Sequence, residues 1–441
     1  MNQMFESRQK VNTESSGMVC EVEKFLGGGG QGEVYRATLG GKPVALKWYF
    51  PATATDEQRK ALETLVRMGA PSDKFLWPLE LASAAGVTGF GYIMPLREAR
   101  YKGIVDMMKR RVEPSFRALA TAGFELSHHY QLLHSKGLCY RDISFGNVFF
   151  DPDSGEVLIC DNDNVAVDDG GNQSSVLGTP RFMAPEVVRG DAMPSTQTDL
   201  FSLSVLLFYM FIVHHPLEGK KELAIKCLDL PAMTKLYGTE PVFIFDPNDN
   251  SNEPDPTYHQ NALAFWHIYP KFIRDLFTKA FTDGISDPQH GRVRESAWRA
   301  NCVRLRDSIF YCAYCQAENF YDVETLKASG GAAGNCWACN KQLVLPVRMR
   351  VGKNVLMLNH DTRLFAHHVD DDKLYDFNQP VAEVTRHPGD PNIWGLKNLS
   401  SEKWVITSTD GTVKDVAPAS SFTLRVGTKI NFGKSEGEIR L

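Results

Sequence analysis

Three polar side chains in the middle of the sequence have the types and spacing that phosphoryl transfer requires. Asp142 lies in the stretch YRDISFGN, Asn147 follows five positions later, and Asp161 comes fourteen positions after that in VLICDND. A carboxylate can orient an attacking hydroxyl, whereas an amide and a second carboxylate can hold a divalent metal ion against phosphate groups. The alternative interpretation is a polar turn followed by an acidic loop. These three residues taken alone leave both interpretations open.

A glycine-rich stretch upstream, LGGGGQGEV, could hold the phosphates themselves. Gly27, Gly29 and Gly32 fit the pattern G-x-G-x-x-G, with Val34 two residues further on. Glycine lets the backbone approach a phosphate closely because no Cβ atom intervenes. Four consecutive glycines satisfy many templates, so a flexible turn is the alternative. The following EVYRATLGGKPVALKW indicates a β-hairpin and not the helix of a dinucleotide-binding unit, so we expect a hairpin that covers phosphates.

Lys47 ends the apolar run VALK, fifteen residues after Gly32. Burying an amine on such a strand is costly unless it meets anions, which suggests phosphates and an acidic partner. The alternative is an edge lysine whose ammonium group reaches solvent. We expect the partner on the next helix, TDEQRKALETLVRM, and favour Glu63 over Glu57. The apolar face that supports this choice is formed by Leu62, Leu65 and Val66.

Four of the nine cysteines form two pairs with metal-ligand spacing. Cys312 and Cys315 lie in CAYC, Cys336 and Cys339 lie in CWAC, and twenty residues separate the two pairs. Two such pairs offer four thiolates for a structural Zn²⁺ site, and a pair of disulfides is the alternative. The remaining cysteines are scattered, and we interpret them as reduced packing residues: Cys20, Cys139, Cys160, Cys227 and Cys302.

These candidate sites must be positioned by several folded units. A chain of 441 residues suggests two to four domains, and its 43% hydrophobic and 23% charged residues are typical of a soluble protein. The net charge of -5 gives no indication of the positive electrostatic field that attracts nucleic acid. The polar start MNQMFESRQKVN is unlike a signal peptide, and the longest apolar run, 203–213, is too short for a membrane span. We therefore expect a cytoplasmic protein with no membrane or nucleic-acid partner.

The residue pattern, and with it the predicted secondary structure, changes along the chain. Residues 1–18 are polar and predict a flexible tail, and residues 19–95 alternate short β-like runs with one helix. Residues 96–310 are mostly helical, and the apolar run 203–213 predicts a buried helix there. The four-cysteine segment spans 311–342, and 343–441 has the alternating runs and turns of an all-β sandwich.

Taken together and in this order, the motifs resemble those of the eukaryotic-like protein kinase family. LGGGGQGEV is similar to its glycine-rich loop, VALK to the strand segment with its phosphate-binding lysine, YRDISFGN to its catalytic loop, and GTPRFMAPE to the end of its activation segment. TDLFSLSVLLF resembles the buried helix that carries the aspartate Asp199, and RVRESAW carries Arg292, which the resemblance pairs with Glu186. The resemblance implies a bilobal α+β kinase fold over residues 19–310, with a β-rich lobe at 19–95 and a helical lobe at 96–310.

The resemblance also implies roles. Asp142 orients the substrate hydroxyl, Asn147 and Asp161 hold Mg²⁺, and Lys47, tethered by Glu63, meets the phosphates of ATP. Met94 takes the gatekeeper position, and the backbone of residues 95–97 meets adenine. Ser174 and Ser175 are candidate phosphorylation sites in a segment that is otherwise a solvated loop, and Thr179 is assigned to support of the substrate loop.

The sequence departs from the family pattern in three places. Tyr140 replaces the usual histidine, a change that active relatives share. Ser144 stands where a lysine normally contacts the transferring phosphate, and its loss removes charge stabilisation that Lys47, Arg141 or a metal ion can supply. Asn162 and Asp163 replace the phenylalanine and glycine after the metal aspartate, so the usual apolar packing residue is absent and Asp163 can place a second carboxylate near the metal.

The C-terminal segment WGLKNLSSEKWVITSTDGTVKDVAPASSFTLRVGTKINFG resembles the later strands of a forkhead-associated domain. Such domains grip phosphothreonine with arginine and serine residues in upstream loops. The upstream DDDKLYDFNQPVAEVTRHPGD lacks a clear set of this kind, so we predict the β-sandwich without assigning phosphopeptide residues. Phosphothreonine binding and simple docking both remain open.

Two functions follow. The first is an ATP- and Mg²⁺-dependent serine/threonine protein kinase that acts on a protein substrate, and the second is a nucleotide-binding pseudokinase scaffold that recruits partners through its C-terminal modules. The combination of kinase, zinc ribbon and forkhead-like module is similar to bacterial stress kinases of tellurium-resistance-type systems. That similarity implies a cognate phosphatase and a von Willebrand factor A protein as partners.

Overall fold

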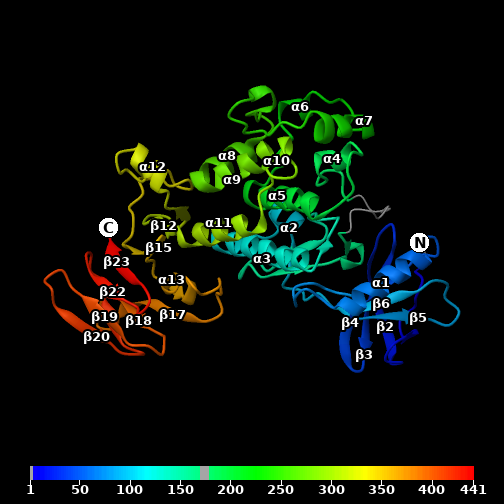
Figure 1. Cartoon of the computed structure of the whole chain (residues 1–441), viewed down its shortest axis with the longest axis horizontal. Coiled ribbons are helices and arrows are strands. Elements are labelled where there is room, and N and C mark those ends of the chain that lie inside the picture. The colour runs from blue at the N-terminus through cyan, green and yellow to red at the C-terminus, as the bar shows by residue number, and fades with distance from the viewer. Residues whose placement is uncertain (1–2, 169–177) are drawn as a thin grey trace. The chain divides into compact units, whose positions relative to one another are not determined.

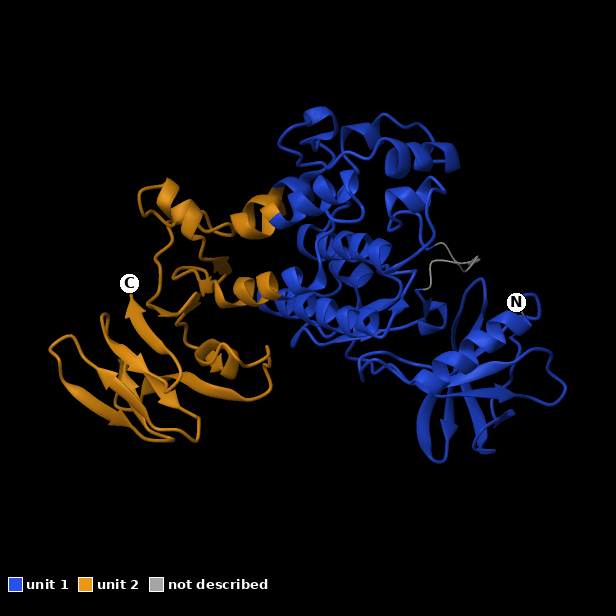
Figure 2. Cartoon of the chain, in the orientation of Figure 1, with its two compact units in different colours: residues 1–263, 276–299 blue, residues 264–275, 300–441 orange. Residues whose placement is uncertain are grey.

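The computed structural model describes residues 3–168 and 178–441. The chain divides into two compact units, shown in Figure 2. Unit 1 comprises 1–263 and 276–299, and unit 2 comprises 264–275 and 300–441. Within the described ranges, no helix combines the length and the apolar character needed to cross a membrane.

The N-terminal lobe of unit 1 is a closed barrel with strand order β1-β2-β3-β4-β6-β5 (Figure 1). Apolar side chains alternate along β1, β2 and β3 and meet inside the barrel, which is how a closed sheet buries one face of each strand. The strands are Lys10–Thr13 (β1), Val19–Gly28 (β2), Gly32–Leu39 (β3), Lys42–Tyr49 (β4), Glu80–Ser83 (β5) and Gly91–Pro95 (β6).

The expectation of a flexible tail over residues 1–18 is wrong for most of that segment. Strand β1 pairs with β2 and with β5, and so closes the barrel. Phe5 and Val11 are fully buried in the barrel core beside Tyr35 and Trp48. Burying two large apolar side chains contributes about 1.5–3 kcal/mol each, which is enough to order a short polar segment.

One helix, α1 (Asp56–Met68), packs beside the barrel and matches the predicted helix. Its start is capped by Thr55, whose side-chain oxygen accepts a hydrogen bond from the backbone N–H of Gln58. Its buried face consists of Leu62 and Leu65. The orientation of this face decides which polar residues of the helix can reach the interior.

The second lobe of unit 1 is helical, as predicted. Helices α3 (Phe116–Ser135) and α5 (Thr196–Ile212) lie side by side in its centre, and α5 is buried along nearly its whole length. A helix that is apolar all round is stable only inside a core, so this segment organises the lobe. The other helices are α2 (Ile104–Met108), α4 (Pro185–Val188), α6 (Lys220–Leu223), α7 (Leu230–Met233), α8 (Gln260–Ile268), α9 (Lys271–Phe281), α10 (Asp283–Ser286) and α11 (Glu295–Asp307).

Short strands carry the loops that matter for function. Strand β9 (Val148–Phe150) lies between β10 (Val157–Ile159) and β7 (Lys102–Gly103), and β8 (Leu138–Cys139) pairs with β11 (Ala166–Val167). The stretch with Asp142 therefore connects β8 to β9, and the stretch with Asp161 follows β10. The antiparallel pairing of β9 with β10 holds these two loops at a fixed separation.

Unit 2 begins earlier in the sequence than the expected boundary at residue 310. It includes parts of α8, α9 and α11, because these segments pack on the cysteine region. Tyr269 stacks on Phe320 with ring centroids 5.3 Å apart, and the backbone N–H of Lys271 donates to Asp322 at 2.7 Å. Strands β12 (Ile309–Tyr311) and β13 (Glu318–Phe320) form a hairpin here, followed by α12 (Val323–Ala328).

The remainder of unit 2 contains two antiparallel sheets that share one apolar core. One has the order β15-β14-β23-β22-β19-β20 and the other the order β16-β17-β18-β21, which is consistent with the predicted sandwich. The bounds are Arg348–Val351 (β14), Asn354–Met357 (β15), Arg363–Phe365 (β16), Ala366–Val369 (α13), Pro380–His387 (β17), Asp390–Asn398 (β18), Trp404–Thr407 (β19), Val413–Val416 (β20), Ser421–Thr423 (β21), Lys429–Asn431 (β22) and Glu436–Arg440 (β23).

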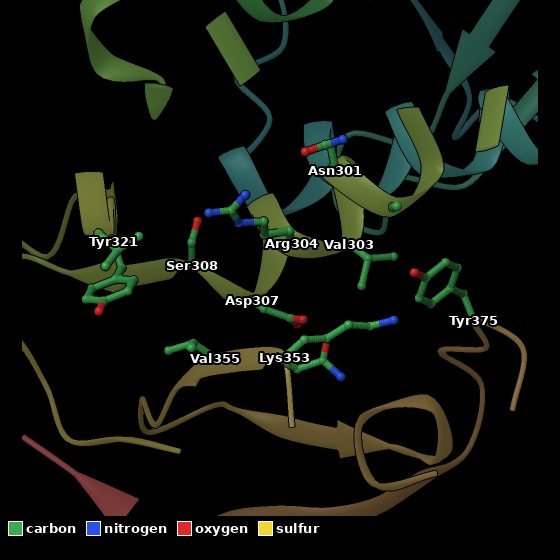
Figure 3. Close-up of a pocket in the computed structure, with 12 residues that line it drawn as sticks. Asn301, Val303, Arg304, Asp307, Ser308, Tyr321, Lys353, Val355 and Tyr375 are labelled. Atoms are coloured by element: carbon green, nitrogen blue, oxygen red, sulfur yellow. The ribbon is translucent and has the colours of Figure 1, made fainter. Parts of the chain in front are cut away.

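A pocket of about 500 Å³ within unit 2 marks the place where its three parts meet. Arg304 and Asp307 reach it from the end of α11, Tyr321 from the cysteine region, and Lys353 from the β14–β15 hairpin (Figure 3). Asn359 of the sheet region also donates to the backbone oxygen of Ile309 at 2.7 Å. The end of α11, the cysteine region and the β sheets are therefore packed as one unit.

Candidate functional site

A cleft of about 680 Å³ in unit 1 gathers most of the predicted site residues. It lies where the glycine-rich hairpin and β4 of the barrel face the loops after β8 and β10 of the helical lobe. Its lining includes Gly27, Gly29, Gly32, Val34, Lys47, Met94, Pro95, Leu96, Arg97, Asp142 and Asp161. Residues more than one hundred positions apart in the sequence therefore share one cavity.

The glycine-rich stretch is the tip of the β2–β3 hairpin, as expected. Gly27 pairs with Val34 across it, and the backbone N–H of Gly29 donates to the oxygen of Gly32 at 2.9 Å. A Cβ atom at Gly27 or Gly29 would meet nothing within 4 Å, so the backbone there is open toward the cleft. A Cβ at Gly32 would instead lie 2.0 Å from the backbone oxygen of Trp48, so this glycine is required by strand packing.

Lys47 projects from β4 into the cleft and its side chain is only 6% exposed. Its Nζ lies 2.7 Å from Asp163 Oδ2 and 3.6 Å from Asp161 Oδ1. Burial alone lowers the pKa of a lysine, but the two carboxylates outweigh this effect, so the pKa of Lys47 is raised and its ammonium group stays charged. Gln31 of the glycine hairpin adds an oxygen 3.4 Å from the same nitrogen.

The expected tether between Lys47 and Glu63 is absent from the structure. Glu63 lies on the exposed side of α1, where it pairs with Arg59 at 3.2 Å and is 54% exposed. The alternative, Glu57, is exposed as well. Because Leu62 and Leu65 direct the buried face of α1, the polar residue that reaches the interior is Gln58, which donates to the hydroxyl of Tyr49 at 3.1 Å.

The acidic partner of Lys47 comes instead from the turn after β10. Asp161 has a left-handed backbone (φ 49°) and begins the short 3-10 turn η1, Asn162–Asn164. Asp163 in this turn is fully buried and accepts hydrogen bonds from Lys47 and from the hydroxyl of Tyr49. Sequence reasoning missed this arrangement, although Tyr49 lies two residues after Lys47 and so shares its face of the strand.

The loop around Asp142 is held by hydrogen bonds on both sides. Asn147 Nδ2 donates to Asp142 Oδ2 at 3.0 Å, and the Thr179 hydroxyl donates to Asp142 Oδ1 at 2.7 Å. The carboxylate of Asp199 on α5 accepts hydrogen bonds from the backbone N–H groups of Tyr140 and Arg141, the latter at 3.0 Å. Arg141 has a positive φ of 71°, and such a strained backbone persists only where the surroundings hold it in place.

Asp199 itself is held by a buried histidine. His134 Nε2 lies 3.1 Å from Asp199 Oδ2, and His134 Nδ1 contacts Glu295 of α11. Burial alone lowers the pKa of a histidine, but these two carboxylates raise the pKa of His134 to about 9. The catalytic-type loop is thus tied to α3, α5 and α11 through one charged side chain.

The other residues singled out in the sequence occupy varied places. Arg292 binds both carboxylate oxygens of Glu186 at 2.7 Å, as the resemblance implied. Ser144 and Asn162 are buried, and Asn162 Nδ2 donates to the backbone oxygen of Ile159. The hydroxyl of Tyr140 donates to the backbone oxygen of Cys160. The candidate phosphorylation sites at 174 and 175 lie outside the described residues.

The four paired cysteines form one cluster in unit 2, with all four Sγ atoms within 4.8 Å of one another. The separations Cys312 to Cys339 and Cys315 to Cys336 are 3.7 Å, far longer than a disulfide bond. Four thiolates about 2.3 Å from a tetrahedral Zn²⁺ stand about 3.8 Å apart, so the cluster fits that ion. Asn319 Nδ2 donates to Cys336 Sγ at 3.5 Å.

Comparison with known proteins bears on this geometry. Residues 96–276 match the family described as "Protein kinase domain". A DNA damage-responsive serine/threonine-protein kinase RqkA of Deinococcus radiodurans is 30% identical over 313 residues, which cover 65% of this chain and 44% of that protein. The CBL-interacting protein kinase 4 of Oryza sativa subsp. japonica is 27% identical over 284 residues, which cover 60% of each protein.

A probable serine/threonine-protein kinase of Dictyostelium discoideum is 25% identical over 258 residues, which cover 57% of this chain and 16% of that protein. The chain thus spans less than half the length of the first curated relatives that it matches. The family match begins at Leu96, which lines the cleft, and includes the loops of Asp142 and Asp161. Residues 96–276 are therefore similar to a protein kinase domain, and these three relatives are named as protein kinases, two of them as serine/threonine kinases.

Proposed function

We propose that this protein is an ATP- and Mg²⁺-dependent serine/threonine protein kinase. The observation that carries the proposal is the convergence of Lys47, Asp142 and Asp161 on one cleft beneath an open glycine hairpin. Phosphoryl transfer depends almost entirely on positioning and charge, and a cation, a hydroxyl-orienting carboxylate and metal-binding oxygens are the groups it needs.

The cleft suits a nucleotide at both ends. Its inner wall is apolar and can take up a planar base, and the residues that form it are Ala45, Leu76, Met94, Leu96 and Phe149. The side chain of Arg97 lies over the ring of Phe149 at 4.0 Å, which leaves the backbone of residues 95–97 to bind the base edge. At the outer end, the open backbone at Gly27 and Gly29 can approach phosphates, and Lys47 supplies a fixed positive charge.

The residues for Mg²⁺ are Asn147 and Asp161, whose carbonyl and carboxylate oxygens are the ligands this ion prefers. The amide nitrogen of Asn147 is committed to Asp142, so its oxygen remains for a metal. When bound, Mg²⁺ neutralises charge on the phosphates. Asp161 is held in position by its left-handed backbone and by Lys47 at 3.6 Å.

Asp142 orients the substrate hydroxyl and accepts its proton. Its two oxygens are fixed by Asn147 and Thr179, so the carboxylate cannot rotate freely. A serine or threonine hydroxyl of a protein substrate would meet it at the mouth of the cleft. The charge stabilisation that is lost at Ser144 can come from Lys47, from Arg141 or from a bound metal ion.

The test is transfer of radiolabelled phosphate from ATP to the protein itself or to a generic serine-rich protein. We expect a signal from the wild type and a loss of about 10²-fold or more in Asp142→Asn, because a positioned general base contributes on this order. ATP·Mg²⁺ binding, measured by calorimetry, should persist in the variant. Binding without transfer in the wild type would instead favour the pseudokinase scaffold.

The other modules have supporting roles in this proposal. The cysteine cluster is a structural Zn²⁺ site of a ribbon over 311–342, because its four ligands leave no open position for chemistry. The sheets over 343–441 form a forkhead-associated-like sandwich that docks partners. By the stated resemblance, those partners include a phosphatase and a von Willebrand factor A protein in a bacterial cytoplasmic stress response.

A further inference from the structure

The buried contact between Lys47 and Asp163 has no counterpart on α1. Gln58 is the polar residue of helix α1 that reaches Tyr49 and the backbone of Asp163, and the acidic residues of the helix are on the exposed side. We propose that Asp163 is the positioning residue that holds Lys47 against the phosphates, in place of a helix glutamate. This inference rests on the proposed kinase function and adds to it the group that orients its cation.

Asp163 is buried and withdrawn from the cleft. The side chain of Asp163 is 0% exposed and does not line the cleft, whereas its neighbours Asp161 and Asn164 do. A carboxylate withdrawn from the cavity is badly placed to bind a metal there. A buried carboxylate is also very costly without a cation and hydrogen-bond donors, so its place in this structure depends on Lys47.

One carboxylate oxygen of Asp163 fixes two side chains of β4. Asp163 Oδ2 accepts from Lys47 Nζ at 2.7 Å and from the Tyr49 hydroxyl. Lys47 and Tyr49 are two residues apart and so point to the same side of the strand. The phenol of Tyr49 therefore holds the carboxylate of Asp163 next to the ammonium group of Lys47. This contact restricts the movement of the lysine side chain.

Asp163 is also linked to Asp161, the carboxylate proposed to bind Mg²⁺. Asp163 belongs to the same short turn as Asp161, and this turn follows the left-handed backbone of Asp161. An ion pair from β4 to Asp163 therefore also fixes the turn that presents Asp161. Gln58 adds a neutral link, since its Nε2 lies 3.1 Å from the Tyr49 hydroxyl and 3.5 Å from the backbone oxygen of Asp163.

The inference is tested with the full chain and five variants. In Asp163→Asn the shape is kept and the charge is lost, and we expect kcat to fall about 10²-fold, the usual loss for one electrostatic contact. The KM for ATP should change much less, and the melting temperature should remain above the assay temperature. Glu63→Gln should retain wild-type kcat, as should the surface control Glu21→Gln.

Rescue distinguishes positioning from simple stability. Gln58→Glu in the Asp163→Asn background returns a carboxylate beside the Tyr49 hydroxyl, and we expect it to restore kcat about tenfold without a matching gain in melting temperature. Tyr49→Phe removes one hydrogen bond to Asp163 and should lower kcat by a few fold. It also serves as the test if Asp163→Asn fails to fold.

Several results would overturn the inference. One is a kcat equal to that of the wild type in Asp163→Asn or in Tyr49→Phe. Another is a loss of kcat in Glu63→Gln as large as the loss in Asp163→Asn. Recovery of Asp163→Asn at high Mg²⁺ concentration would show that Asp163 is a metal ligand and not the tether of Lys47. If the wild type transfers no phosphate, the proposed kinase function fails, and calorimetry with ATP·Mg²⁺ decides the inference separately: weaker binding by Asp163→Asn supports it and equal binding refutes it.

Discussion

Replacing His134 should change how the stability of unit 1 depends on pH. His134 bridges Asp199 and Glu295, and Asp199 in turn holds the backbone of Tyr140 and Arg141. The side chain of His134 is only 10% exposed, so solvent screens these contacts little. In His134→Gln the position can still form hydrogen bonds, but it carries no charge at any pH.

The size and sign of the effect follow from the pKa of His134, which is raised from 6.5 to about 9. At about 1.4 kcal/mol per pH unit, this difference corresponds to about 3 kcal/mol of stability. Because the pKa of the folded state is the higher one, the stabilisation is fully present below pH 6.5. It is lost as the pH rises through 9, where the folded protein also releases the proton.

The assay is urea unfolding of the full chain between pH 6 and 9.5, with the free energy of unfolding taken from the transition of unit 1. We expect the wild type to lose about 3 kcal/mol more than His134→Gln over this range. His290→Gln, a change at an exposed histidine of unit 1, should behave as the wild type does. Equal pH dependence in wild type and His134→Gln would refute the charged bridge.

Three further predictions concern other parts of the molecule. Gly32→Ala should lower the melting temperature because its Cβ would clash with the backbone of Trp48, whereas Gly29→Ala should fold normally and weaken ATP binding, as calorimetry can show. Cys336→Ser should lose stoichiometric zinc by metal analysis, and chelation of the wild type should lower the melting temperature of unit 2 in calorimetric scans. Arg292→Met should cost about 3–5 kcal/mol in urea unfolding by leaving Glu186 buried and unpaired, and adding Glu186→Gln should recover part of that loss.

Much of the candidate site could be predicted from the sequence because its parts are local. Asp142 and Asn147 are five residues apart in one loop. The glycine stretch belongs to one hairpin, which its own residues predicted. The cysteine pairs belong to two tight turns that each present two thiolates. In such cases chain geometry brings the groups together, and distant packing has little to add.

The partner of Lys47 depended on packing across the whole domain. Glu63 and Asp163 are both acidic and both follow Lys47, and only the rotation of α1, set by the burial of Leu62 and Leu65, turns Glu63 toward solvent. Asp163 is 116 residues from Lys47 and reaches it through the turn after β10.

The same contrast holds for the boundaries of the domains. Strand β1 is short and polar in sequence and is ordered by pairing with β2 and β5, the second of which lies about seventy residues away in the chain. The sequence predicted that residues 264–275 and 300–310 belong to the helical lobe, yet they pack with the cysteine region. The sequence alone determined which chemical groups are present and how neighbouring ones are spaced. Their partners over long distances were decided by the tertiary structure, because burial of apolar faces sets the orientation of each element.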